Sequence, residues 1–240
     1  MPKINFSLII PCYNEGPTFE TNVKQIITEL EKLKLSWEVI FVEDKSTDDT
    51  KETLEKIQKN IKGSQIILHK TNTGRGKTVR DGIEAASGEI CGFIDVDCEI
   101  LPSYIPIFIE EIKKGNDMVI ATRFYENYPD SINRYISSKI YSAIARRILN
   151  LPLSDTEAGY KFFKRERVLP ILAKTRDNGW FWDTEICAQA YMNGLKISQV
   201  PVLFVRRDDK KSTVRIIPDS FEYLKKLTRF SLKYRRELHK

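Results

Sequence analysis

The chain has 240 residues, of which 41% are hydrophobic, and a formal net charge of +6. A chain of this length and composition can bury a large core, so we expect one globular domain rather than a disordered protein. Its longest stretch without a charged residue is 11 residues, from 4 to 14. A membrane-spanning helix needs ~20 such residues, and a secretory signal needs a longer apolar region, so we expect a cytoplasmic protein.

The positive charge is concentrated at the end of the chain. Residues 206–240 hold 12 Lys or Arg against 5 Asp or Glu, which leaves residues 1–205 with a net charge of −1. A nearly neutral body argues against a broad nucleic-acid-binding face. The basic tail predicts an anionic partner of its own.

Apolar patterns predict alternating strands and helices over the first hundred residues. The expected strands are Phe6–Ile10, Trp37–Val42, Gln65–Leu68 and Ile90–Ile94, and amphipathic helices separate them. Such alternation predicts βαβ units and a mostly parallel sheet with helices on both faces. In open sheets of this kind, ligands bind beyond the carboxyl ends of the strands.

Three of these strand ends carry polar clusters, at Tyr13–Glu15, Glu43–Asp44 and Asp95–Glu99. We expect the three clusters to meet at one crevice. If the chain stays extended after Ile94, Asp95, Asp97 and Glu99 face the same side. Mg²⁺ or Mn²⁺ held by one or two carboxylates keeps positions free for diphosphate oxygens, so a nucleotide-binding metal site is predicted. The alternative is a solvated acidic turn.

The second half predicts further elements of the same sheet. A strand from Met118 ends at Arg123, which could hold phosphate or form a surface salt bridge. A helix expected over Asn133–Asn150 places Arg134 and Ser138 one turn apart. Ile197–Val205 is expected to be the last strand, and its Pro201 indicates an edge position or a bulge. Without repeats or linkers, we divide the chain into one domain, 1–212, and a basic amphipathic segment, 213–240.

The run Gly76-Lys77-Thr78 follows a strand and invites comparison with a phosphate-binding loop. That motif requires a glycine five positions before Gly76, and residue 71 is Thr. We therefore expect these glycines to let the backbone approach a ligand or to start a helix tightly.

Taken in order, several segments resemble family 2 glycosyltransferases of the GT-A fold. They are SLIIPCYNE, VEDKSTDDT, NTGRGKTVRDGI, ASGE and the DVD pair of Asp95 and Asp97. The later DTEAGYKFF and FWDTE segments, with Arg134 and Ser138, resemble the dolichyl-phosphate mannosyltransferase or polyprenyl-phosphate glycosyltransferase branch. The resemblance covers roughly Ser7 to Ser212.

The resemblance implies roles for individual residues. Asp97, Arg123 and Arg134 would be catalytic, Asp97 and Glu99 would bind Mg²⁺ or Mn²⁺, and Arg134 and Ser138, helped by Arg123, would hold the acceptor phosphate. The nucleotide-sugar site would comprise Pro11, Tyr13, Glu15, Val42, Asp44, Asp95, Val96, Arg123, Arg206 and Lys211. Glu43 and Lys45 depart from the DDGS sequence usual in the family, which leaves the preferred base open.

The predicted function is metal-dependent, inverting transfer of a sugar from a nucleoside-diphosphate sugar to a polyprenyl phosphate. One alternative is transfer to a saccharide hydroxyl, with Asp183 or Glu185 as the base unless they serve to cap their helix. Another is a non-catalytic nucleotide-sugar-binding subunit. Trp180-Phe181-Trp182 is expected to be core packing or a sugar or lipid platform.

The C-terminal segment is predicted to be a basic amphipathic helix that lies on the cytoplasmic membrane face or on a membrane-protein partner. Its apolar stripe would comprise Ile217, Phe221, Leu224, Leu227, Phe230, Leu232 and Tyr234. The alternative is a terminal helix that docks on the body of the protein.

Overall fold

The computed structural model describes residues 3–125, 143–206 and 216–238, with side chains of the last helix described from 221 to 232. Seven strands of the described chain form one sheet in the order β3-β2-β1-β4-β6-β5-β7. The strands are β1 (Phe6–Cys12), β2 (Trp37–Glu43), β3 (Ser64–Leu68), β4 (Ile90–Ile94), β5 (Met118–Tyr125), β6 (Tyr160–Lys164) and β7 (Ile197–Phe204). The helices are α1 (Phe19–Glu31), α2 (Thr50–Gln58), α3 (Arg75–Ala85), α4 (Ile105–Lys113), α6 (Arg165–Leu172), α7 (Trp182–Met192) and α8 (Ile216–Leu238).

The predicted mostly parallel sheet is confirmed. β1 pairs in parallel with β2 and β4, β2 with β3, and β5 with β7. β6 runs antiparallel to both β4 and β5. β7 lies at the edge of the sheet, as its proline predicted, because an edge position spares the missing backbone N–H.

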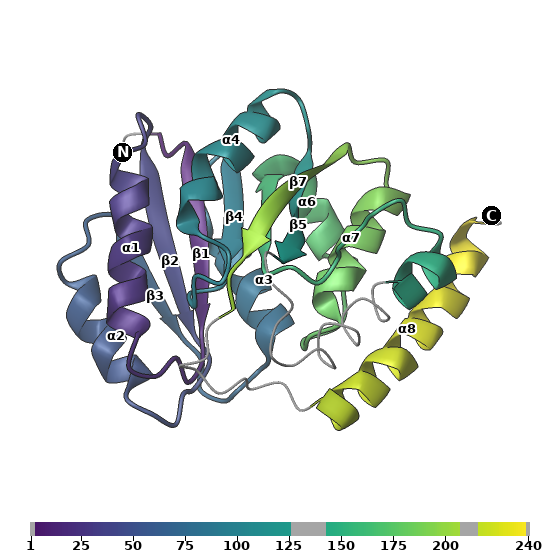
Figure 1. The fold of residues 1–240 in the computed structure, drawn as a ribbon, viewed down its shortest axis with the longest axis horizontal. Coiled ribbons are helices and arrows are strands. Elements are labelled where there is room, and N and C mark those ends of the chain that lie inside the picture. The colour runs from purple at the N-terminus through teal and green to yellow at the C-terminus, as the bar shows by residue number, and fades with distance from the viewer. Residues whose placement is uncertain (1–2, 126–142, 207–215, 239–240) are drawn as a thin grey trace.

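Helices cover both faces of the sheet (Figure 1). One apolar core joins α1 and α4 to one face, through residues such as Ile26 and Phe108, and a second joins α3, α6 and α7 to the other, through Val79 and Trp182. The strands are therefore buried on both sides, which explains their nearly continuous apolar sequences. No helix of the described residues is long and apolar enough to cross a membrane.

Helix α8 lies at the side of the molecule farthest from α1 and α2 (Figure 1). Its Leu227 is fully buried, and its Tyr223 and Phe230 rings contact Phe181 edge-on at 5.4 and 5.8 Å between centroids. Phe221 and Leu232 instead face solvent, 74% and 60% exposed. The single apolar stripe predicted for this helix is therefore wrong: one set of apolar side chains docks on the body and another points away.

Candidate active site

The carboxyl ends of β1, β2 and β4 lie at one edge of the sheet, as predicted. Cys12 at the end of β1 is in register with Glu43 at the end of β2, and Ile9 is in register with Phe93 of β4. Since these three strands are neighbours, the polar residues that follow them share this edge.

The turn after β1 is held by its own glutamate and by α2. The backbone N–H of Tyr13 donates to Glu15 Oε1 at 2.9 Å, and the N–H of Glu15 donates to Thr50 Oγ1 at 2.8 Å. Pro11 pairs in register with Val42, whose side chain is fully buried in the core. Val42 lies within the sheet, in register with Pro11 on one side and Ile67 on the other, whereas Tyr13 is partly exposed beyond the end of β1.

Asp44, which follows β2, is an anchor for the glycine-rich turn. Its carboxylate accepts hydrogen bonds from the N–H groups of Thr73 and Gly74, both at 2.8 Å, and from the Thr73 hydroxyl at 2.8 Å. Its Oδ1 also lies 2.7 Å from His69 Nδ1. The side chain is only 4% exposed. The amides of this turn are thus occupied by protein, and the rejected phosphate-loop interpretation finds no support in the geometry.

The same turn packs closely on the segment before α7. Gly74 has φ +92°, and a Cβ there would lie 2.5 Å from the Asn178 carbonyl oxygen. The N–H of Gly76 donates to that oxygen at 2.8 Å. The glycines therefore permit a tight helix start, which was one of the two expectations, and the close backbone approach seen here is to Asn178.

Arg75, the first residue of α3, joins two carboxylates that are distant in the sequence. Its Nη1 lies 2.5 Å from Asp95 Oδ1, and its Nε lies 2.9 Å from Asp183 Oδ2. Lys161, fully buried, also contacts Asp183 at 2.6 Å. Although burial alone would lower the pKa of Arg75, the attraction of Asp95 and Asp183 raises it above its usual value. Arg75 is therefore a permanent cation at this edge.

The acidic segment after β4 departs from the extended path that was expected. The chain turns at Val96 and Asp97, and Cys98 has φ +56°. Burial still alternates, because Asp95, Asp97 and Glu99 are partly exposed while Val96 and Cys98 are buried. The three acidic residues thus share the more open side of the turn, although the backbone there is not a strand. The side chain of Val96 faces the core.

The oxygens of Asp97 and Glu99 are the hard ligands that Mg²⁺ and Mn²⁺ prefer. The N–H of Glu99 donates to Asp97 Oδ1 at 3.2 Å, so the two residues lie together in the turn. The part of the chain that the structure describes contains no group of three or more His, Cys, Asp or Glu suited to a metal. A pair of carboxylates fits an ion that takes its other ligands from a diphosphate and water.

The end of β7 closes this side of the site. The N–H of Val205 donates to the carbonyl oxygen of Glu99 at 2.8 Å, and Ile100 forms a bridge with Phe204. Arg206, the next residue, is exposed. Because Val205 bonds to Glu99, the backbone of Arg206 lies close to the predicted metal ligands. Lys211 lies outside the described residues, as do Arg134 and Ser138.

Arg123 forms a two-pronged ion pair with Asp155. Its Nε and Nη2 lie 2.7 and 2.9 Å from the two carboxylate oxygens, and its guanidinium lies over the Phe204 ring at 5.6 Å. The alternative of a salt bridge is thus what the structure contains, but it is buried rather than on the surface. Nη1 takes no part in this two-pronged contact.

Glu157 lies next to this pair and touches α8. The Tyr223 hydroxyl hydrogen-bonds to Glu157 and lies 2.7 Å from the Thr184 hydroxyl. Burial raises the pKa of Glu157 to about 7; the charge of Asp155 adds to this effect and that of Arg123 opposes it. The carboxyl is therefore a titrating group near neutral pH. No sequence argument singled it out, although it lies inside the DTEAGYKFF segment.

The two candidate bases of the hydroxyl-acceptor hypothesis are both engaged in the fold. Asp183 is buried between Arg75 and Lys161, and Glu185 Oε2 accepts the N–H groups of Arg176 and Asp177 at 2.9 and 2.8 Å. Neither caps the start of α7, which has no side-chain cap. Glu185 holds the segment before this helix in place, whereas Asp183 ties α7 to α3 and β6.

The fold and its acidic strand ends define the class of protein as a GT-A-type α/β enzyme. Solved structures agree on the fold. The structures of glucosyl-3-phosphoglycerate synthase from Mycobacterium tuberculosis in complex with UDP, and with Mn²⁺, UDP-glucose and phosphoglyceric acid, match with TM-scores of 0.71 and 0.72. Both matches cover 95% of this chain and 80% of the other, at 20% sequence identity.

Residues 7–169 match the model of glycosyl transferase family 2, and the chain belongs to this family. Glycosyltransferase AglD of Haloferax volcanii is 27% identical over 216 residues, which are 87% of this chain and 34% of AglD. The undecaprenyl-phosphate 4-deoxy-4-formamido-L-arabinose transferase of Salmonella choleraesuis is 25% identical over 231 residues, 95% of this chain and 68% of that protein. The chain is thus a glycosyltransferase that spans about a third of one relative and two thirds of another.

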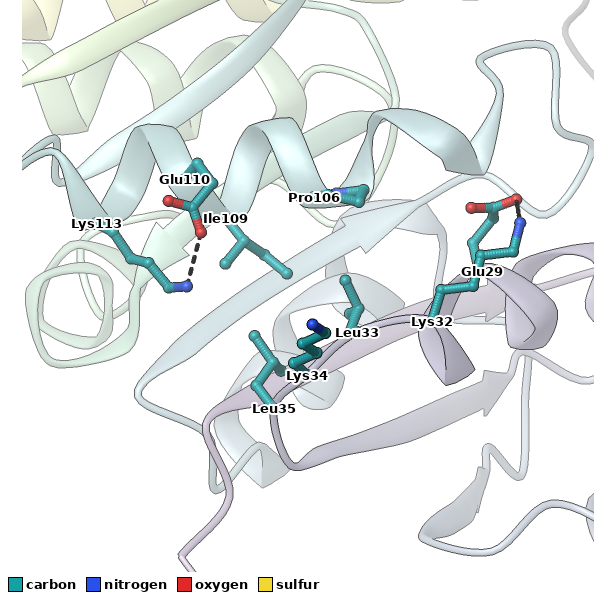
Figure 2. A pocket seen from close by; sticks show the side chains of 9 residues that line it. All are labelled: Glu29, Lys32, Leu33, Lys34, Leu35, Pro106, Ile109, Glu110 and Lys113. Carbon is teal, nitrogen blue, oxygen red and sulfur yellow. Dashed lines mark hydrogen bonds and ion pairs between the residues drawn. The ribbon is translucent and has the colours of Figure 1, made fainter.

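A surface groove lies away from these residues. A groove of about 350 Å³ separates the end of α1 from α4, with Leu33, Leu35, Pro106 and Ile109 among its lining residues (Figure 2). Two of its lysines pair with neighbouring glutamates, Lys32 with Glu29 and Lys113 with Glu110. Because α1 returns toward the start of β2, the groove lies near the amino ends of the strands, opposite the candidate active site.

Proposed function

We propose that the chain transfers a sugar from a nucleoside-diphosphate sugar to a polyprenyl phosphate, with inversion at the anomeric carbon. The observation that carries the donor part is the convergence of the Tyr13, Asp44 and Asp95–Glu99 segments at one edge of neighbouring parallel strands. The acceptor part is supported by the Salmonella relative, whose name includes undecaprenyl phosphate.

Transfer breaks the bond between the anomeric carbon and the diphosphate, on which negative charge grows. Asp97 and Glu99 would hold Mg²⁺ or Mn²⁺, which supplies positive charge to the leaving diphosphate oxygens. Arg206 follows Val205, whose backbone N–H bonds to Glu99, so its guanidinium can add positive charge near these carboxylates. Direct attack from the opposite face of the sugar inverts the anomeric centre.

The nature of the attacking group favours a lipid phosphate. A phosphate oxygen is ionised at neutral pH and needs cations to seat it, whereas a sugar hydroxyl needs a carboxylate base. Asp183 and Glu185 are both committed to other contacts. Arg123 can bind a phosphate through Nη1 while Asp155 holds its other two nitrogens. Arg134 and Ser138 complete the proposed acceptor site.

The outer face of α8 supports attachment to the cytoplasmic face of an anionic membrane. Phe221 and Leu232 are exposed there, with Lys225 and Arg229 exposed between them. Apolar side chains can enter the headgroup region, and each basic residue near the surface contributes about 1 kcal/mol. The inner face keeps the helix docked on the protein.

The test is an incubation with a panel of radiolabelled nucleotide sugars, Mg²⁺ or Mn²⁺ and polyprenyl phosphate, followed by extraction. We expect label in the organic phase, its loss in Asp97→Ala, and sedimentation of the protein with vesicles that contain anionic lipid. Label only in water-soluble glycans would overturn the lipid acceptor. Full activity of Asp97→Ala in EDTA would overturn the metal-dependent mechanism.

A further inference from the structure

Trp180 is an exposed aromatic side chain at the candidate active site. It is 44% exposed, whereas Phe181 and Trp182, the next two residues, are buried. The guanidinium of Arg75 lies 5.3 Å from the centre of the Trp180 ring. The same guanidinium contacts Asp95, so Trp180 and Asp95 both lie within reach of one side chain. One face of the indole is covered by this cation, and part of the side chain remains open to solvent.

The segment that carries Trp180 is fixed rather than loosely attached. The N–H of Gly179 donates to Asp177 Oδ1 at 2.7 Å, and the carbonyl of Asn178 accepts the N–H of Gly76. Lys226 of α8 binds Asp177 Oδ2 at 2.7 Å. The backbone that leads into Trp180 therefore loses little conformational freedom when a ligand binds.

We propose that Trp180 and Asp95 form the subsite that binds the sugar ring of the donor, with Arg75 as the residue that positions both. The inference rests on the proposed use of a nucleotide sugar. A pyranose ring has an apolar C–H face that can pack on the indole and hydroxyl groups that can donate to the Asp95 carboxylate. Binding sites commonly combine an aromatic wall with a few fixed polar groups in this way.

The charges around Asp95 and Trp180 favour a sugar ring over the phosphate groups, the nucleoside and the polyprenyl chain of the two proposed substrates. The Asp95 carboxylate can accept hydrogen bonds from hydroxyl groups even when it is paired with Arg75, and it has no favourable contact to offer a polyprenyl chain. Its side chain is 37% exposed and uses Oδ1 for Arg75. The nucleoside is expected at the ends of β1 and β2. The neutral, hydroxyl-rich part of the donor matches the remaining surface.

Arg75 acts through its neighbours rather than on the ligand. Its guanidinium lies close to the rings of both Phe93, at 5.6 Å, and Trp180. Its Nη2 is buried and has no hydrogen-bond partner among the described residues. A Cβ on Gly159 would lie 1.8 Å from Asp95 Oδ2 and 2.7 Å from Arg75 Nη2, so glycine is required beside the pair. Arg75 therefore fixes the positions of the Asp95 carboxylate and the Trp180 ring relative to each other.

The test compares binding of nucleotide sugars with binding of the matching nucleoside diphosphates, by calorimetry with Mg²⁺ and without acceptor. The probes are UDP-glucose with UDP and GDP-mannose with GDP. For the sugar that wild type binds, Trp180→Ala should weaken binding roughly tenfold and leave the diphosphate within about twofold. Tyr191→Ala, which removes an aromatic residue of similar exposure on α7, is the matched control and should change neither.

Substitutions of Arg75 separate positioning from general stability. Arg75→Lys keeps the charge and should retain part of the preference for the nucleotide sugar, whereas Arg75→Gln should lose it, with the diphosphate affinity kept in both. An unchanged ratio of sugar to diphosphate affinity in Trp180→Ala would overturn the inference. So would unchanged donor binding with a raised KM for polyprenyl phosphate, because Trp180 would then serve the acceptor.

These outcomes are distinct from failure of the proposed function. If wild type binds no nucleotide sugar, both proposals are wrong. If wild type binds a nucleotide sugar with the predicted dependence on Trp180 but labels no lipid, only the acceptor assignment is wrong.

Discussion

Asp44 and Asp95 occupy equivalent places on two strands of the same sheet, yet their surroundings differ. Each follows the carboxyl end of its strand, and both reach the turn that leads into α3. Asp44 binds the backbone of that turn with both oxygens and is 4% exposed. Asp95 binds one cation, Arg75, with Oδ1 and is 37% exposed.

A carboxylate satisfied by several fixed donors and closed to solvent serves the fold. A carboxylate held by one cation and open to solvent has capacity left for a ligand. The difference indicates that Asp44, after β2, holds the glycine-rich turn in place, whereas Asp95, after β4, can bind a ligand. Substitution of Asp44 should therefore act mainly on stability, and substitution of Asp95 mainly on activity.

The largest effect is expected for Asp95→Asn. The amide is close in shape to the carboxylate but lacks the charge that holds Arg75. Arg75 then no longer fixes the position of Trp180 relative to the sugar. We expect kcat/KM for the donor to fall on the order of 100-fold, the scale of losing one preorganised polar group. The free energy of unfolding should fall by less than in Asp44→Asn, because the Asp95 side chain is 37% exposed and Arg75 keeps its second carboxylate, Asp183.

The control for this substitution is Glu110→Gln. It removes an exposed ion pair, with Lys113, beside the groove at the opposite edge of the sheet. Sugar transfer by this variant should equal that of wild type. A comparable loss of activity in both variants, or unfolding of Asp95→Asn alone, would contradict the distinction drawn between the two aspartates.

Asp44→Asn should produce the next largest effect, and on stability. An asparagine must present its NH₂ group to at least one of the N–H or O–H donors that face Asp44, and the site is buried. Leaving such a donor unsatisfied costs about 1–3 kcal/mol in the free energy of unfolding. Urea denaturation measures the loss.

Asp49→Asn is the matched control for that measurement. Asp49 lies at the start of α2 but is exposed and makes no capping hydrogen bond through its side chain. Its substitution should change stability by less than about 0.5 kcal/mol. Equal destabilisation by the two variants would show that Asp44 is not an anchor.

Much of the fold follows from patterns of short range. The apolar runs of β1, β2 and β4 and the helical spacing of Val23, Ile26 and Leu30 in α1 are local signals, and the structure confirms both. The meeting of three polar strand ends followed from parallel pairing alone. The family itself was evident from motifs in a fixed order.

The contacts that complete the site depend on tertiary packing, which the sequence does not display. Arg75 and Asp183 are 108 residues apart, and no local period connects them. The turn at Val96–Asp97 was missed because alternation of burial continued while the backbone left the strand. The apolar residues of α8 divide between two sides because, among the described residues, the body of the protein packs against one side of the helix.

The smallest expected effect concerns Glu157. This carboxyl lies near Arg123, which is already paired with Asp155. Burial raises its pKa to about 7 from an ordinary value near 4.5, so between these pH values the folded chain keeps a proton that the unfolded chain releases. The contribution of Glu157 to the free energy of unfolding therefore falls as pH rises from 5 to 8. Glu157→Gln, neutral throughout, lacks this dependence and should gain thermal stability relative to wild type at pH 8 but not at pH 5.

Thermal melts of both proteins at pH 5 and pH 8 measure this difference, with Glu111→Gln as the control of opposite kind. Hydrogen bonds from Lys114 and Ser198 lower the pKa of Glu111, so its stabilising effect is lost only as pH falls below the ordinary value. The difference between Glu111→Gln and wild type should therefore be nearly constant from pH 5 to pH 8. If Glu157→Gln behaves in the same way, Glu157 is ionised throughout this range. Arg123 would then be shared by Asp155 and Glu157, with less of its charge left for an acceptor phosphate.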